Sequence, residues 1–351
     1  MKILHSADLH LDTPFTGRSP SEADYLKKQL LAIPQKLAAL CRQEQCDMML
    51  LAGDLFDGPA TRQSLDALRL ALEEAAVPVF IAPGNHDPVG LSSPYMTEDW
   101  PSNVHIFTQN TPQSLSVPGL DCRIYGAGYR SMDCGSLLEG FHAEGGERYH
   151  IGLFHGDPTN AASPCCPITA EQIQESGLDY LALGHIHQGG SLRWGDTLCA
   201  WPGCPMGRGF DELGPKGVLI VTVDGGVETR QVCLDTPVFH DEETTVDALP
   251  KLFSAQGNLD FYRITLIGEN SGPSAMELYR RYERFPHLQI RDRRTTPVDL
   301  WSRADSDSLE GTFFRILKET MATADPKEKE IIALAARISR QLLDGQEVEL
   351  I

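Results

Sequence analysis

The chain has 351 residues, of which 41% are hydrophobic and 23% are charged, and its formal net charge is −19. This length and composition predict a globular protein with one large core and an appended part. The chain shows neither a secretory signal nor a run of ~20 apolar residues, so we expect a cytoplasmic location without membrane contact. The acidic balance argues against non-specific binding of nucleic acid, because phosphate contacts are made by Lys and Arg.

Residues 1–235 alternate short apolar segments with stretches of helical character. The segments that predict strands are KILHSA, DMMLLAG, PVFIAPG, RIYGAG, HIGLFHG, YLALGH and GVLIVTV. Apolar residues recur at helical spacing over residues 26–45 and 61–76, between the first three of these strands. This alternation predicts an α/β sheet with helices packed on it, in which ligands gather beyond the carboxyl ends of the strands.

The pattern changes after about residue 240. There FYRITLIGE, SAMELYRRYERF and LQIRDRR predict a strand, a helix and a strand, which make a small α+β unit. We therefore expect three parts: a first domain over residues 1–240, an α+β domain over residues 241–300 and a helical tail over residues 301–351.

Two helices are predicted in the tail. Asp307 is the expected N-cap of the first helix. Asp325 is the expected N-cap of the second, with Pro326 in the first turn and Glu328 completing a capping box.

Five polar clusters each follow a predicted strand. They are DLH at 8–10, GDLFD at 53–57, GNHD at 84–87, HGD at 155–157 and GHIH at 184–187. Each cluster alone could be a turn, which Gly, Asn and Asp favour. If LALGHIH is one strand, His185 and His187 point to the same side, because side chains in a strand alternate. Five such clusters in this order are hard to ascribe to chance.

The clusters supply seven side chains that mix carboxylate, amide and imidazole: Asp8, His10, Asp54, Asn85, His155, His185 and His187. Seven ligands are too many for one tetrahedral ion but fit two ions that share a carboxylate. Nitrogen and oxygen ligands without thiolate suit Mn, Fe or Zn, and the nine cysteines lack zinc-site spacing. Two ions ~3.5–4 Å apart are a standard device for phosphoester cleavage.

The order D-x-H, G-D-x-x-D, G-N-H-D, a lone His and G-H-x-H resembles the calcineurin-like metallophosphoesterase superfamily over roughly the first 210 residues. The resemblance implies an α/β fold with a four-layer α/β/β/α core, to which the small α+β cap and the helical tail are added. It implies two divalent ions, with Mn²⁺ the first expectation and Fe, Zn or Mg the alternatives. One ion would be held by Asp8, His10, Asp54 and His187. The other would be held by Asp54, Asn85, His155 and His185.

The same resemblance gives roles to residues beside the ligands. His86 would donate a proton to the leaving oxygen, and its rival role is to stabilise phosphate charge. Asp57 and Asp87 are expected to orient the ligands. Arg208, in the GRGF segment, is expected to touch a substrate phosphate.

A softer resemblance points to one branch of the superfamily. The opening ILHSADLHLD and the segment AWPGCPMGRGFDELGPKGVLIV are similar to SbcD-type and YhaO-type DNA-repair exonuclease subunits. This implies a two-metal phosphodiesterase acting on DNA as a 3′→5′ exonuclease, with endonuclease activity a further option. The alternatives are a small-molecule or nucleotide phosphodiesterase or phosphatase with the same ligands, and a non-catalytic scaffold for an ABC-type ATPase. The scaffold would need a broken metal site, and all the ligand positions are intact.

Two further features concern partners. Residues 280–294 hold six arginines, Arg291, Arg293 and Arg294 among them, against two acidic residues, so this segment could bind DNA although the chain is acidic. An ordinary solvated helix face is the alternative. The amphipathic tail helices either pack on each other or dock on an SMC-like ABC ATPase of the SbcC or YhaN type. A homodimer is left open.

Overall fold

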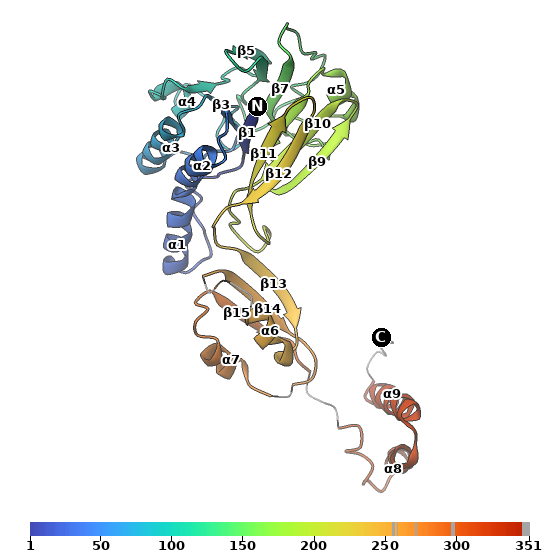
Figure 1. Cartoon of the computed structure of the whole chain (residues 1–351). Helices are drawn as coiled ribbons and strands as arrows, with labels where there is room; N and C mark the ends of the chain where they lie inside the picture. The colour runs from blue at the N-terminus through green and yellow to red at the C-terminus, as the bar shows by residue number, and fades with distance from the viewer. Residues whose placement is uncertain (255–256, 258, 271, 296–298, 346–351) are drawn as a thin grey trace. The chain divides into compact units, whose positions relative to one another are not determined.

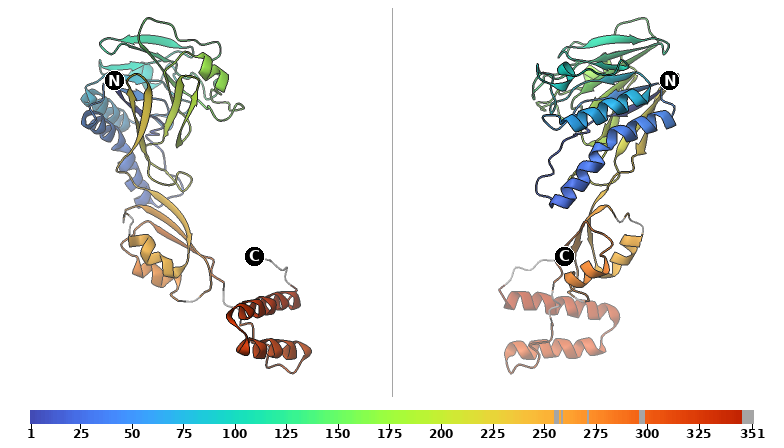
Figure 2. Two further views of the ribbon diagram at one scale, coloured as in Figure 1. Left: turned by 45° about the vertical axis from the view of Figure 1, so that its right-hand side comes forward. Right: turned by 90° about the vertical axis from the view of Figure 1, so that its left-hand side faces the viewer.

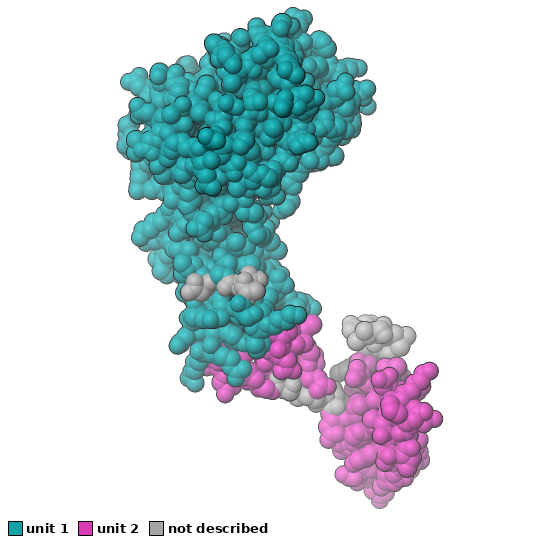
Figure 3. Space-filling model, in the orientation of Figure 1, with its two compact units in different colours: residues 1–243, 250–265, 279–291 teal, residues 244–249, 266–278, 292–351 magenta. Residues whose placement is uncertain are grey.

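The computed structural model describes residues 1–254, 257, 259–270, 272–295 and 299–345 (Figure 1). The chain forms two compact units, which Figure 3 shows in teal and magenta. Unit 1 comprises residues 1–243, 250–265 and 279–291, and unit 2 comprises residues 244–249, 266–278 and 292–351. The division into domains over residues 1–240, 241–300 and 301–351 stays a prediction.

The first sheet of unit 1 has the strand order β12-β11-β1-β2-β3-β4. The four strands from β1 to β4 run parallel, and β11 and β12 are antiparallel to their neighbours. The bounds are β1 Lys2–Ser6, β2 Met48–Leu51, β3 Val79–Ile81, β4 Val104–Ile106, β11 Gly217–Val223 and β12 Val227–Cys233.

The second sheet has the order β5-β6-β7-β8-β10-β9, in which β6, β7, β8 and β10 run parallel. The bounds are β5 Gln113–Val117, β6 Cys122–Gly126, β7 Tyr149–His155, β8 Tyr180–Gly184, β9 Gln188–Trp194 and β10 Thr197–Gly203. All seven strands expected in this part of the chain are therefore confirmed in one sheet or the other.

Side-chain alternation along the strands produces separate layers. Leu4 of β1 packs in a core with α1 (Pro20–Leu31), α2 (Ile33–Gln43) and α3 (Arg62–Ala75). Its neighbour Ile3 packs in the core between the two sheets. On the other sheet Leu153 joins that central core, whereas Phe154 packs toward α5 (Ala170–Glu175). The four-layer α/β/β/α arrangement is thus confirmed (Figure 2).

A buried polar contact joins the two sheets. The hydroxyl of Tyr180, on β8, lies 2.7 Å from Nδ1 of His5, on β1, and the other ring nitrogen of His5 donates to the carbonyl of Leu183 at 3.1 Å. Burial lowers the pKa of His5 to about 3. The imidazole is therefore neutral in the folded protein at neutral pH.

The stretch of helical spacing over residues 26–45 falls in two helices. Helix α1 ends at Leu31 and α2 begins at Ile33. Pro34 lies in the first turn of α2, where its missing N–H costs no hydrogen bond. In the interior of a longer helix the same proline would remove a backbone hydrogen bond, so α1 does not extend through it.

The small α+β unit is confirmed in kind. Its sheet has the order β13-β14-β15. The bounds are β13 Phe239–Thr244, β14 Phe261–Leu266 and β15 Leu288–Asp292, and the helices are α6 Leu249–Ser254 and α7 Ala275–Arg281.

The tail consists of α8 (Leu309–Thr323) and α9 (Pro326–Leu343), which pack on each other around Phe314 and Ala336. Asp325 and Glu328 form the predicted capping box. The predicted cap at Asp307 is wrong by one residue, because Ser308 has the extended backbone and its hydroxyl accepts from the third amide of α8. No helix within the described residues combines the length and the apolar character that crossing a membrane requires.

Candidate metal centre

The polar clusters lie in loops that leave the carboxyl ends of the central strands in unit 1. Four of their residues adopt left-handed backbone conformations, which are uncommon for residues other than glycine: Asp8 at φ 53°, His10 at 47°, Asp54 at 51° and His185 at 97°. Each such residue costs of order ~1–3 kcal/mol and persists only where its surroundings impose it. Four of the ten non-glycine residues with positive φ among the described residues are therefore predicted ligands.

Two glycines are required by close approach. A Cβ at Gly84 would lie 2.2 Å from Oδ1 of Asp54, and a Cβ at Gly184 would lie 1.9 Å from the carbonyl oxygen of Ala52. The glycines that open GNHD and GHIH therefore allow the loops to pack around the Asp54 carboxylate and its strand.

The two histidines of GHIH reach the centre by a route other than the expected one. Strand β8 ends at Gly184, His185 is in the left-handed region, and β9 begins only at Gln188. The expectation that LALGHIH forms one strand with both histidines on one side by alternation is therefore wrong. A turn directs each imidazole separately, and the amide of His185 donates to the Asp8 carboxylate at 3.0 Å.

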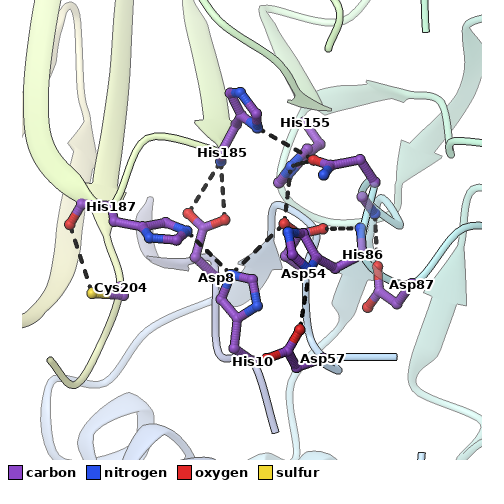
Figure 4. A network of polar contacts seen from close by, with 12 residues as sticks. Asp8, His10, Asp54, Asp57, His86, Asp87, His155, His185, His187 and Cys204 are labelled. Atoms are coloured by element: carbon purple, nitrogen blue, oxygen red, sulfur yellow. Dashed lines mark hydrogen bonds and ion pairs between the residues drawn. The ribbon is translucent and has the colours of Figure 1, made fainter. Parts of the chain in front are cut away.

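One half of the centre brings His10, His187 and Asp8 together (Figure 4). The Nε2 atoms of His10 and His187 lie 3.1 Å apart, and His10 Nε2 lies 3.7 Å from Oδ2 of Asp54. Nδ1 of His10 is buried and has no hydrogen-bond partner among the described residues.

The other half is built around His155. Its Nδ1–H donates to the carbonyl of Ala52 at 2.9 Å. Burial acts to lower the pKa of His155, but Asp54 and Asp8 outweigh it and raise that pKa to about 9, so a bound ion would replace the proton on Nε2. That Nε2 lies 2.8 Å from Oδ1 of Asn85 and 3.4 Å from Oδ2 of Asp54. Nδ1 of His185 lies 3.3 Å from the same Asn85 oxygen.

These contacts fit divalent cations. Lone pairs of imidazole, amide and carboxylate converge at distances where a positive ion between them would remove their mutual repulsion. Burial, and next to it the charge of Arg208, lowers the pKa of His10 to about 2. Burial and His155 lower the pKa of His185 to about 4. Both rings are therefore neutral at pH 7, which is the form that binds metal.

The two carboxylates differ in their electrostatic surroundings. Burial raises the pKa of Asp8 to about 6. Burial also acts to raise the pKa of Asp54, but the charge and hydrogen bond of His155, with His10, outweigh it and hold that pKa below its ordinary value. Asp54 is thus the stable anion at the middle of the centre.

His86 lies at the edge of the same centre and is the exposed member. Its side chain is 42% exposed, its ring meets that of His10 edge-on at 4.8 Å, and its amide donates to Oδ1 of Asp54 at 2.9 Å. Nδ1 of His86 lies 3.1 Å from Oδ1 of Asp57. Distance also groups His86 with His10 and Asp54, so geometry by itself does not separate a ligand from a proton donor.

Asp57 and Asp87 support the centre in different ways. Asp57 contacts His86, and it also accepts from the hydroxyl of Thr13 at 3.0 Å. Asp87 is buried and accepts from the backbone amides of Leu55 at 2.7 Å and Gly84 at 2.9 Å. It therefore joins the two loops that carry Asp54 and Asn85.

Glu212 is a residue that the sequence reasoning missed. One of its oxygens lies 2.7 Å from Nδ1 of His187 and accepts from the guanidinium of Arg208 at 2.6 Å. A carboxylate on the outer nitrogen of a metal-binding histidine orients the ring and raises its basicity. In the sequence, the GRGF segment drew attention only through Arg208, and no feature of its neighbours distinguished Glu212.

The arginines expected to bind substrate fall into two groups. Arg208 reaches the centre, with Nη2 2.9 Å from Nδ1 of His187, but Glu212 holds its Nε and Nη2 atoms. Arg291 and Arg293 are exposed, in units 1 and 2 respectively. The guanidinium of Arg294 binds Asp292, with contacts of 2.8 and 2.6 Å. Their role in substrate binding stays a prediction.

Comparisons with known proteins agree with this geometry. The family model described as calcineurin-like phosphoesterase matches residues 1–189. The chain is 34% identical over 244 residues to the uncharacterized metallophosphoesterase YhaO of Bacillus subtilis (strain 168), covering 64% of this chain and 58% of that protein. It is 27% identical over 273 residues to SbcD of the nuclease SbcCD from the same organism, covering 65% of this chain and 68% of that protein.

Among solved structures, a dimetal phosphatase from Danio rerio is 13% identical and aligns with a TM-score of 0.41, over 66% of this chain and 98% of that one. The match to YhaO spans less than two thirds of that relative's length. The family model covers more than half of this chain, and the two Bacillus relatives bear the names of the branch that the sequence resembles. The chain belongs to the calcineurin-like phosphoesterase family.

Proposed function

We propose that this protein is a two-metal phosphodiesterase that acts on DNA, as a 3′→5′ exonuclease with endonuclease activity a further option. The observation that carries the proposal is the convergence of the seven predicted ligands around Asp54, with His86 exposed beside them. The similarity to a component of a nuclease supports DNA as the substrate class. The proposed ligand sets are those implied by the sequence, with Asp54 shared.

When bound, two divalent ions, Mn²⁺ foremost, would supply an activated water and neutralise charge on the phosphate. The protein contributes the placement of the donors and a proton source. His86 donates Nδ1–H to Asp57, which leaves Nε2 for the substrate. In the imidazolium form, Nε2 protonates the leaving oxygen, and the contact with Asp57 orients the ring.

The test is Mn²⁺-dependent digestion of end-labelled single- and double-stranded DNA, run beside bis(p-nitrophenyl) phosphate. We compare the wild type with Asp54→Ala and His86→Ala, and use Asp66→Ala, an exposed ion-pair residue on α3, as the matched control. Degradation of DNA that both site variants abolish and the control preserves supports the proposal.

Other outcomes separate the alternatives. Turnover of the small diester with intact DNA would favour a small-molecule phosphodiesterase. Absence of all turnover with every metal would favour the non-catalytic scaffold.

We also propose that the tail docks on an SMC-like ABC ATPase, because the relative's name makes it one part of a larger nuclease. Apolar side chains of α8 and α9 are exposed: Leu309, Phe313, Ile316, Ile331, Leu334 and Leu342. Such a pair of helices suits helix-in-groove packing. Ile316→Ser with Leu334→Ser should abolish co-purification with the ATPase and leave hydrolysis of the small diester unchanged; retained binding would exclude this face.

A further inference from the structure

A polar cavity of unit 1 opens beside the metal centre. It has a volume of about 610 Å³ and is lined by residues 13–18, residues 208–212, Asp57, Arg263 and Gln289. Two of its walls touch the centre directly, because Asp57 contacts His86 and Arg208 contacts His187. A molecule bound at His86 can therefore extend into this cavity without leaving the protein surface.

Two arginines in the cavity share one aromatic ring. The guanidinium of Arg263 lies 3.9 Å from the ring centre of Phe210, and that of Arg18 lies 5.2 Å from the same ring. Arg18 also faces Phe239 at 5.1 Å and Phe261 at 5.4 Å. Cation–π contacts hold the planes of both groups while leaving their N–H edges available.

These two arginines are half-buried and have few close acceptors among the described residues. Among the described residues, the guanidinium of Arg18 contacts aromatic rings and has neither a hydrogen-bond acceptor nor an ion-pair partner. Arg263 has a single contact, of 3.2 Å, with Asp241, and its Nε is buried without a partner. Burial lowers the pKa of Arg18; the carboxylate of Glu22 opposes this, the charge of Arg263 adds to it, and Asp211 opposes it.

Arg208, in the same cavity, shows the contrast. Its guanidinium is matched by Glu212, which is 6% exposed, through contacts of 2.6 and 3.3 Å. Arg208 is thus neutralised by a buried partner, whereas Arg18 has no ion pair among the described residues and Arg263 has only the 3.2 Å contact with Asp241. The two cations face the same ring and repel each other. An anion between them would replace that repulsion with charge-assisted hydrogen bonds.

The loop that carries Arg18 is fixed to the centre. Phe15 has φ 53° and Gly17 has φ 82°, so the loop turns sharply on both sides of Thr16. At its start the Thr13 hydroxyl donates to Asp57 at 3.0 Å. The loop therefore holds Arg18 at a defined position relative to His86.

We infer that Arg18 and Arg263 form a subsite for a second phosphate of the substrate, next to the phosphodiester that is cleaved. The inference rests on the proposed function and sharpens it: the preferred substrates are oligonucleotides with adjacent phosphates, rather than esters with one phosphate. A separate cavity on the other side of His86, of about 450 Å³, is lined by Phe56, Pro88 and Pro94 and by no Lys or Arg among the described residues. The two sides of His86 therefore differ in charge.

The test compares Arg18→Gln, Arg263→Gln and the double variant with the wild type. Arg230→Gln is the matched control. Arg230 lies on the edge strand β12 and pairs with Glu44, and its side chain is 59% exposed. Binding of a fluorescein-labelled oligothymidylate is measured by anisotropy in EDTA, where no hydrolysis occurs. Steady-state kinetics with Mn²⁺ then use the oligonucleotide and bis(p-nitrophenyl) phosphate, and thermal melting shows that each variant is folded.

We expect the double variant to bind the oligonucleotide about 10- to 100-fold more weakly. The slope of log affinity against log salt should fall by about one for the lost phosphate contact. KM for the oligonucleotide should rise with kcat nearly unchanged, and turnover of bis(p-nitrophenyl) phosphate should stay within about twofold, since it carries one phosphate.

The outcomes separate this inference from the proposed function. A wild type that neither binds nor degrades DNA overturns the proposed nuclease. A wild type that degrades DNA, with a double variant equal to it in affinity and salt slope, overturns the subsite alone. An equal loss on both substrates means that the arginines support the metal centre and not a second phosphate, and this too overturns the subsite.

Discussion

At the metal centre the buried side chains are polar, whereas in the tail the exposed side chains are apolar. Asp8, His10, Asp54 and His155 are each at most 1% exposed, but Ile316 and Ile331 of the tail are 57% and 60% exposed. Buried charges are retained only when they are paired or bind ions, and exposed apolar faces on helices commonly bind other proteins. The contrast teaches that the first region offers donors for ions, while the second offers an apolar surface to another protein.

The tail should be the more fragile of the two regions. Its core consists of Ala304, Phe314 and Ala336, so Phe314→Ala removes the only large side chain buried in that described cluster. A change of this kind costs about 3–5 kcal/mol. We expect limited proteolysis to cut α8 and α9 in this variant while hydrolysis of the small diester is retained.

Phe313→Ala is the matched control, because that side chain is 41% exposed. It should resist protease like the wild type. Equal resistance of both variants would show that the tail has another source of stability.

The ions should stabilise only the first region. At a free concentration 100-fold above Kd, a ligand that binds only the folded state adds about 2.7 kcal/mol to the free energy of unfolding. We expect Mn²⁺ to slow hydrogen exchange in the strands that precede the ligands and to leave α8 and α9 unchanged. Asp54→Ala should remove the effect; slowed exchange in the tail would contradict the contrast.

Glu212→Gln tests whether the metal centre depends on the charge of a residue that is not itself a predicted ligand. The variant keeps the size of the side chain but weakens the contact with His187 and the charge balance of Arg208. Removing such a support typically costs 10- to 100-fold in metal affinity or activity. Titration of Mn²⁺ against activity measures the loss. Glu98→Gln, a surface ion-pair residue, is the control, and an equal effect in both would assign the loss to general electrostatics.

A separate effect concerns a buried polar group outside the centre. The pKa of His5 is about 3 in the folded protein, below its ordinary value of 6.5, so between these values the unfolded chain binds the extra proton. Stability is therefore full above pH 6.5 and falls with acid, by about 1.4 kcal/mol per pH unit. Urea unfolding from pH 7 to pH 4 should show a flatter profile for His5→Gln than for the wild type, and parallel profiles would refute the assignment.

Much of the catalytic fold could be predicted because local pattern and global position agree. The strand segments are apolar runs, and five of the seven are followed by a polar cluster that reaches the centre. The seven predicted ligands stand out for the same reason: their residue types are unusual directly after buried strands. The left-handed turn at His185 could not be read from alternation, because a packed loop, not a strand, sets its direction.

Residues that act through long-range contacts could not be predicted. Glu212 meets His187 across a loop, and Arg18 meets Arg263 only after the chain has folded. Nothing in their neighbouring residues marks them, since each is an ordinary charged residue in sequence. The cap at Ser308 was missed for a local reason: Asp307 and Ser308 are both good caps, and the backbone conformation decides between them.

The left-handed residues at the centre have a consequence for kinetics. Because Asp8, His10, Asp54 and His185 are already held in their turns by the surrounding packing, the loops need little rearrangement when ions arrive. The loops lose their conformational entropy during folding. The rate of metal binding should therefore be limited by water exchange on the ion rather than by loop motion. Stopped-flow mixing with Mn²⁺ should accordingly show a single phase whose rate rises linearly with metal concentration.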